Sequence, residues 1–326
     1  MSSTLLGSHT SVRPSRKSAN ARSTSTTAQY EPPLLGTNEH TRCASTFLEG
    51  WVGRYHRTMS VDIDLAIKKS DDGKWIRERL PARVLDTDVY ELANSPMLVR
   101  GLAADDRIRL FEDGQYELLE RGRNVAVQVF GEWTEMDALA QHVASVGGRL
   151  CGKEPRIRVF TLPLSLGLHT IETTIDDVVR EFSGLTWLFG NLTPVDLAIG
   201  ISEGGEPLSE SQLMLEHPDG SFELVSSPLL APGIAAGDRI RVKDDGRFEL
   251  NEASGNVAVQ TFGDWDLTFF TPKVVELGGH LDGQAGNEAA VFTFPPEVSP
   301  NDIDALFSAE ASASANRTWL VSNAAS

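Results

Sequence analysis

The chain of 326 residues is 40% hydrophobic and 23% charged, and its formal net charge is -17 at pH 7. These values are typical of soluble globular proteins with about two domains, and no stretch approaches the roughly 18 to 20 apolar residues that a membrane-spanning helix needs. A strongly acidic surface repels nucleic-acid phosphates and anionic membranes, so the charge disfavours both. It either favours a basic protein partner or serves only to maintain solubility. We expect a cytoplasmic protein.

The charge is distributed unevenly along the chain. Residues 1–58 contain seven Lys/Arg and three Asp/Glu, whereas the remainder contains 22 and 43. The first segment is also rich in Ser, Thr and Ala and has too few apolar residues to offset the entropy lost on ordering, so it is predicted to be a disordered arm. Met59 opens the first patterned segment, which suggests that the arm is upstream sequence translated by mistake; a transit peptide is the alternative.

Alternating apolar residues from Val61 to Ile67 predict the first strand. Short alternating runs follow at residues 80–85, 90–92, 107–111 and 115–119. Asp113-Gly114 separates the last two runs and is a strong hairpin signal, because such turns need positive φ at their central positions. This half of the domain is predicted to be a small antiparallel β unit.

The pattern changes at Asn124, after which Val125, Val127 and Val129 share one strand face. Helices are predicted after the potential caps Thr134 and Thr170, and strands at 149–151, 157–162 and 186–189. The resulting order β-α-β-β-α-β is that of a ferredoxin-like sandwich whose helices cover one sheet face.

The segment Tyr90–Trp133 recurs without a gap 132 positions later as Phe222–Trp265, with 25 identities at 44 aligned positions. In the second copy Pro272 is predicted to delay the first helix, and Ser299-Pro300 is predicted to begin the second. We therefore predict an α+β protein of two tandem repeats, 59–191 and 192–326, each a β unit followed by a ferredoxin-like sandwich. Such a duplication suggests a fused dimer, and hence a monomer with an intrachain pseudo-dimer.

Short turn motifs in both copies carry a resemblance. Asn94-Ser95-Pro96 and Gly101-Leu102-Ala103 recur as Ser226-Ser227-Pro228 and Gly233-Ile234-Ala235. The pattern resembles an uncharacterised bacterial family, domain of unknown function 4265, over nearly the whole of each repeat. The tryptophan that the family tends to carry upstream is missing after Glu78-Arg79-Leu80. The resemblance implies no activity.

The candidate binding residues are polar positions aligned between the copies. Asp106 with Arg107 and Arg109 on one strand face could hold a carboxylate or phosphate, or could form an Asx turn beside a solvated strand face. Glu78 could share acid and base roles with its counterpart across a cleft, or could lie at a solvated strand end. Asn124 is expected in a turn, and Gln128 needs a partner if it is covered. The counterparts are Glu210, Asp238, Arg239, Arg241, Asn256 and Gln260.

Known catalytic constellations are absent from the sequence. None of the seven histidines aligns with another across the repeat, which disfavours a histidine site built into each copy, although one copy could have kept a site that the other lost. The two cysteines support neither a disulfide framework nor a metal cage. We predict no catalytic residue, cofactor or metal. The first hypothesis is a non-catalytic binding module, accessory or immunity-like, with a basic protein partner; the alternative is an enzyme or small-molecule binder with a site between the repeats.

Overall fold

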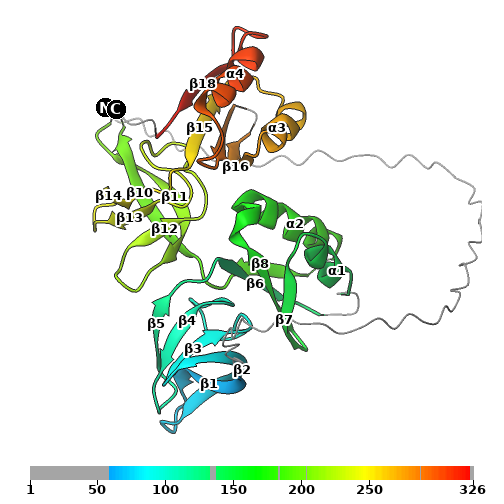
Figure 1. Cartoon of the computed structure of the whole chain (residues 1–326), viewed down its shortest axis with the longest axis vertical. Coiled ribbons are helices and arrows are strands. Elements are labelled where there is room, and N and C mark those ends of the chain that lie inside the picture. Colours follow the sequence, from blue (N-terminus) through cyan, green and yellow to red (C-terminus); the bar gives the residue numbers. More distant parts are fainter. Residues whose placement is uncertain (1–58, 133–136, 183, 203, 287, 324–326) are drawn as a thin grey trace, which may run out of the picture. The chain divides into compact units, whose positions relative to one another are not determined.

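The computed structural model describes residues 59–132, 137–182, 184–202, 204–286 and 288–323 (Figure 1). The predicted arm 1–58 and the predicted helix cap Thr134 lie outside these residues. The described segments all belong to one compact unit, His56–Ser326.

The first repeat begins with a five-stranded antiparallel meander. Its strands, in the order of the sheet, are β1 (Ser60–Lys69), β2 (Trp75–Asp86), β3 (Val89–Leu92), β4 (Arg107–Leu110) and β5 (Tyr116–Glu120). Ile63 and Leu65 alternate with more exposed neighbours and are buried, as the pattern predicts. Gly114 occupies the β4–β5 turn with φ of 85°, and its carbonyl accepts a hydrogen bond from the N–H of Ala66 in β1. The last hairpin is thereby tied back to the first strand.

An α/β half completes the first repeat. Its elements are β6 (Asn124–Phe130), α1 (Asp137–Ser145), β7 (Arg149–Glu154), β8 (Ile157–Pro163), the 3-10 turn η1 (Leu164–Leu166), α2 (Leu168–Glu181) and β9 (Thr186–Phe189). The antiparallel sheet has the order β7-β8-β6-β9. Val127 and Val129 pack against Leu139 of α1 and Ile175 of α2, so the helices cover the valine face.

The second repeat has the same architecture. Its elements are β10 (Thr193–Ile201), β11 (Pro207–Glu216), β12 (Phe222–Leu224), β13 (Arg239–Val242), β14 (Phe248–Glu252), β15 (Val257–Phe262), α3 (Leu267–Glu276), β16 (His280–Ala285), β17 (Ala289–Phe294), α4 (Pro300–Ala311) and β18 (Thr318–Val321). The sheet orders are β10-β11-β12-β13-β14 and β16-β17-β15-β18. Strand register is kept as well, since Val127 pairs with Phe189 and Val259 pairs with Val321. The structure is therefore α+β, with one arrangement present twice.

Two helix starts differ from the sequence prediction. Pro272 does not delay α3, which begins five residues earlier because the side chain of Asp266 accepts a hydrogen bond from the N–H of Phe269 and caps the helix. Pro272 lies inside the helix and is exposed. Thr170 does not cap α2, because the helix begins at Leu168 after Gly167, whose φ of 76° turns the chain out of η1.

The two repeats also contact each other. Leu164 and Leu168 of the first repeat form a small apolar cluster with Leu213, Leu215 and Val225 of the second, so the β unit of the second repeat covers an edge of the preceding α/β half. A polar joint lies beside this cluster and is described next.

Candidate functional site

Asp106 and Asp238 are buried acceptors in equivalent turns. Asp106 accepts hydrogen bonds from the N–H groups of Ala103 (2.9 Å) and Gly122 (2.7 Å) and pairs with Arg121 at 3.1 Å. Burial raises the pKa of Asp106 above its usual value, although the charge of Arg121 acts in the opposite direction. Asp238 accepts from the N–H of Ala235 and from both N–H and hydroxyl of Ser254. Both aspartates therefore organise their own turns.

Glu78 and Glu210 are not the solvated strand ends that the sequence favoured, and they are not an acid–base pair. Each carboxylate accepts three backbone N–H groups of its own repeat: Met97, Leu98 and Val99 for Glu78, and Leu229, Leu230 and Ala231 for Glu210. The side chains therefore hold the loop that follows β3 or β12. The sequence prediction was wrong because Glu78 and Glu210 lie on strands among polar residues. Such a local pattern does not show that each side chain binds a loop that follows later in the chain.

The aligned amides also have structural roles. Gln128 and Gln260 are buried on the sheet face opposite the helices, and they donate to the carbonyls of Met97 and Pro228 at 3.1 and 3.4 Å. The predicted need for a partner is thus met by the loops that the glutamates hold. Asn124 and Asn256 donate to the carbonyls of Ala104 and Ala236. Asn124 does not lie in a turn as predicted, because it is the first residue of β6 and its φ is not positive.

The arginines of the two β units behave differently. Arg107 and Arg109 lie on the exposed face of β4 and pair with Glu120 and Glu117 on β5, as expected of a solvated strand face. The side chain of Arg239 is only 30% exposed; its guanidinium lies 3.2 Å from Asp219 and 3.6 Å from Glu252. Arg241 reaches only the carbonyl of Asp219, at 3.5 Å. Among these arginines, only Arg239 lines a pocket that joins both repeats.

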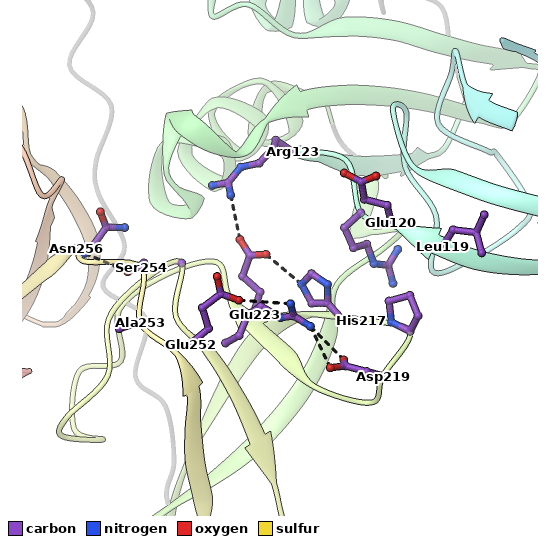
Figure 2. A pocket seen from close by; sticks show the side chains of 14 residues that line it. Leu119, Glu120, Arg123, His217, Asp219, Glu223, Glu252, Ala253, Ser254 and Asn256 are labelled. Atoms are coloured by element: carbon purple, nitrogen blue, oxygen red, sulfur yellow. Dashed lines mark hydrogen bonds and ion pairs between the residues drawn. The ribbon is translucent and has the colours of Figure 1, made fainter. Parts of the chain in front are cut away.

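That pocket has a volume of about 750 Å³ and lies between β5 and its following loop in the first repeat and the β12–β14 region of the second (Figure 2). We call it the inter-repeat pocket. Arg239 and Asn256 are its only members among the predicted site residues. Its charged lining residues are Glu120, Arg121, Arg123, Asp219, Glu223, Arg239 and Glu252, together with His217.

Arg121 fixes the wall of the pocket. Its side chain is 7% exposed, and its guanidinium pairs with Asp106, donates to the carbonyl of Gly101, and crosses to the second repeat, where Nε donates to the carbonyl of Glu216 at 2.7 Å. Arg123 also reaches across and lies 3.5 Å from Glu223, which is 3.1 Å from Nε2 of His217 (Figure 2). The pocket is thus built on charged contacts between repeats.

Most of the exposed charged side chains at the rim of the pocket are carboxylates, each already paired with an arginine: Glu120 with Arg107, and Asp219 and Glu252 with Arg239. The exposed fractions of the side chains are 61% for Glu120, 53% for Asp219 and 70% for Glu252, and the exposed cation is Arg123. Hydrogen bonds from the hydroxyl and N–H of Ser221 lower the pKa of Asp219 to about 2, so this carboxylate remains charged throughout the physiological range. Such a rim suits a cationic group.

His280 belongs to a network of polar side chains in the second repeat. His280 Nε2 lies 3.0 Å from Asp282 Oδ1, while Asp282 Oδ2 accepts the N–H of Ser227 and the hydroxyl of Thr293, which is itself bonded to the hydroxyl of Ser227. The aspartate and the threonine separate the serine from the imidazole, so this is not the relay of a serine hydrolase. Arg149 and Cys151 stand at the equivalent positions of β7, which explains why no aligned histidine is found.

The pocket residues that the sequence analysis missed are mostly positions that differ between the copies. Arg121 is replaced by Ala253 and Arg123 by Gly255, while Asp219 stands where the first copy has Thr87. Selecting identical positions therefore found residues that shape both copies. A search for charged residues that only one copy carries would have found Arg121, Arg123 and Asp219, but not Glu120 and Glu252, which are aligned and identical.

Within the described part of the chain, no group of three or more His, Cys, Asp or Glu residues is placed to hold a metal ion. No helix among those residues is long and apolar enough to cross a membrane.

Comparison with known proteins gives a family but no activity. The family model described as "Domain of unknown function (DUF4265)" matches residues 78–185 and 212–316. No curated protein matches the chain. A solved structure titled "Novel crystal structure of a hypothetical protein from Neisseria gonorrhoeae" is similar at 19% sequence identity and a TM-score of 0.35, covering 40% of this chain and 94% of that one. The two matched segments span well over half of the sequence, and the chain belongs to the DUF4265 family as a tandem duplication of its domain.

Proposed function

We propose that this protein is a non-catalytic interaction module that binds a basic segment of a protein partner at the inter-repeat pocket. The observation that carries the proposal is the imbalance of exposed charge at the rim, where Glu120, Asp219 and Glu252 are each more than half exposed. A Lys or Arg side chain entering the pocket would meet these carboxylates, and the net charge of -17 would steer a basic partner toward it.

The duplication has a direct role in this proposal. Neither copy alone supplies the pocket, because Glu120 belongs to the first repeat and Glu252 to the second. Arg121 and Arg123 hold the second repeat against the first through Glu216 and Glu223. We therefore infer that the chain acts as a monomeric pseudo-dimer, with the repeats bounded near 59–191 and 192–326. The strand order of each α/β half supports a ferredoxin-like assignment.

The test uses the full chain and a short fluorescein-labelled peptide of Lys and Arg, followed by fluorescence anisotropy. Glu120→Lys/Glu252→Lys is expected to weaken peptide binding by roughly tenfold or more, since each lost surface pair contributes up to about 1 kcal/mol and reversal adds repulsion. The matched control is Asp72→Lys/Glu132→Lys, which changes net charge equally at residues that do not line the pocket. Binding should weaken as salt is raised from about 0.05 to 0.2 M.

Equal weakening by both double variants would refute a localised site and leave only non-specific attraction. The small-molecule alternative rests on Arg239, whose Nε is buried and makes no hydrogen bond within the described residues. If Arg239→Ala abolishes a thermal shift caused by a small carboxylate or phosphate, and the basic peptide does not bind, the alternative replaces the proposal.

A further inference from the structure

A second cavity lies wholly within the second repeat and adjoins the inter-repeat pocket, with which it shares Ala253 and Asn256. It has a volume of about 470 Å³ and lies between the N-terminal turn of α4, strand β18 and the loop before β15. Val257, Ile303, Trp319 and Val321 provide its apolar wall. We call it the α4 pocket.

The equivalent region of the first repeat is covered by the protein itself. Leu168 and Phe189, at the positions of Pro300 and Val321, belong to the apolar cluster that packs against the β unit of the second repeat. Arg121, at the position of Ala253, is buried in its ion pair with an aspartate. Replacement of Leu168, Phe189 and Arg121 by the smaller Pro300, Val321 and Ala253 leaves the α4 pocket open.

A second copy of the chain is a poor occupant. The residue that covers the first repeat most deeply is Leu215, which is 1% exposed, and its counterpart in the first β unit is Arg83. Arg83 is 52% exposed and pairs with Glu91. Docking the first β unit of another molecule would bury this charge against the apolar wall, which is costly. The pocket therefore suits a small molecule rather than continued stacking of repeats.

The polar groups of the α4 pocket indicate the charge of that molecule. Its ionisable lining residues are Asp238 and Asp304. Asp238 is already satisfied by the turn that it organises, whereas Asp304 is exposed and makes no ion pair or hydrogen bond within the described residues. With two carboxylates and no cation in the lining, the pocket favours a cationic ligand.

Trp319 supplies an aromatic surface, and its ring also packs against Phe307 with the ring centroids 5.5 Å apart. In the first repeat the indole N–H of Trp187 donates to Asp176 at 2.7 Å. Ser308 stands at the position of Asp176, and the indole N–H of Trp319 makes no hydrogen bond within the part of the chain that is described. An aromatic ring beside a free carboxylate is the combination that recognises organic ammonium groups, by ring contact and charge together.

We propose that the α4 pocket binds a small aromatic amine, with its ring against Trp319, Ile303 and Val321 and its ammonium group at Asp304. The proposed amine contacts involve neither Glu120 nor Glu252. Substitution of these two glutamates therefore tests the binding of a basic protein segment and does not test the binding of the amine.

The test is calorimetric titration of the full chain with 2-phenylethylamine, and with 2-phenylethanol and phenylacetate as neutral and anionic counterparts. The amine should bind more tightly than the alcohol, and phenylacetate most weakly. Val321→Phe introduces the residue of the first repeat into the pocket and should abolish binding of the amine. Leu320→Phe, at the adjacent position whose side chain is 45% exposed, is the matched control and should leave binding unchanged.

Asp304→Asn separates charge recognition from shape. The substitution should weaken the binding of 2-phenylethylamine by roughly tenfold and leave the binding of 2-phenylethanol unchanged. Thermal unfolding of each variant checks that the fold is kept. Absence of binding by all three probes, equal binding of amine and phenylacetate, or binding that survives Val321→Phe in a folded protein would overturn the proposal. Glu120→Lys/Glu252→Lys should bind the amine normally.

Discussion

Replacement of Glu78 by glutamine tests the claim that the aligned glutamates hold loops. In the native protein Oε2 accepts the N–H groups of Leu98 (2.8 Å) and Val99 (3.1 Å), while Oε1 accepts that of Met97. An amide can present its oxygen to only one of these two positions. Its NH₂ group then faces a backbone N–H, so one donor loses its acceptor.

The expected cost follows from these three bonds. Leaving one part-buried N–H unsatisfied costs about 1–3 kcal/mol, and two bonds to a charged acceptor become weaker bonds to a neutral one. We therefore expect Glu78→Gln to lower the free energy of unfolding by about 2–4 kcal/mol. Glu210→Gln should have a similar effect, because Glu210 makes the same three bonds in its own repeat.

Urea unfolding followed by circular dichroism measures the loss, and amide hydrogen exchange at residues 97–99 reports it locally. Glu117→Gln is the control, since its pair with Arg109 is about half exposed on both sides and should contribute at most about 1 kcal/mol. A loss below about 1 kcal/mol for Glu78→Gln, or unchanged exchange of the loop amides, would refute the role assigned to the carboxylate.

Three further predictions concern the joint and the cores. Arg121→Met should destabilise the chain by about 3–5 kcal/mol, because it leaves Asp106 buried without its cation; urea unfolding measures this, and Asp106→Asn should recover part of the loss. Burial opposes protonation of His280, but its hydrogen bond to Asp282 and the charge of that residue outweigh burial and raise the pKa above 6.5. The protonated His280 therefore contributes to the free energy of unfolding fully below pH 6.5, and this contribution is lost as the pH rises through the raised pKa. In urea unfolding measured at a series of pH values, the His280→Gln variant should lack this decrease in the free energy of unfolding. Phe307→Ala should cost about 3–5 kcal/mol in the same assay, because Phe307 is fully buried at the centre of an aromatic cluster; a loss under 1 kcal/mol would contradict this packing.

The fold was largely predictable because its signals are local. Alternation in β1, the Asp-Gly turn before β5 and the apolar stripe of α2 each act over a few residues, and the duplication shows every one of them twice. The errors at Thr170 and Pro272 concern which of several nearby residues begins a helix. That choice depends on the chain entering the helix, as at Gly167 and Asp266, and not on the pattern within it.

The candidate site was less predictable because it depends on contacts distant in sequence. The sequence around Glu78 does not show that its carboxylate binds backbone N–H groups about twenty residues later in the chain. The sequence around Arg121 likewise does not show that its guanidinium donates to the carbonyl of Glu216. Among the twelve candidate residues, Arg239 and Asn256 alone reach the inter-repeat pocket. Sequence could locate framework residues but could not show which surfaces of two similar domains would meet.

The difference between Arg121 and Ala253 links both proposals. In the first copy the arginine neutralises a buried aspartate and donates a hydrogen bond to a backbone carbonyl of the second repeat. In the second copy Ser254 satisfies Asp238 with its N–H and hydroxyl instead. Because the hydroxyl of Ser254 is much smaller than the guanidinium of Arg121, Asp238 keeps its hydrogen bonds and the volume beside it remains unfilled. The replacement of Arg121 by the smaller Ala253 therefore contributes to the space of the α4 pocket.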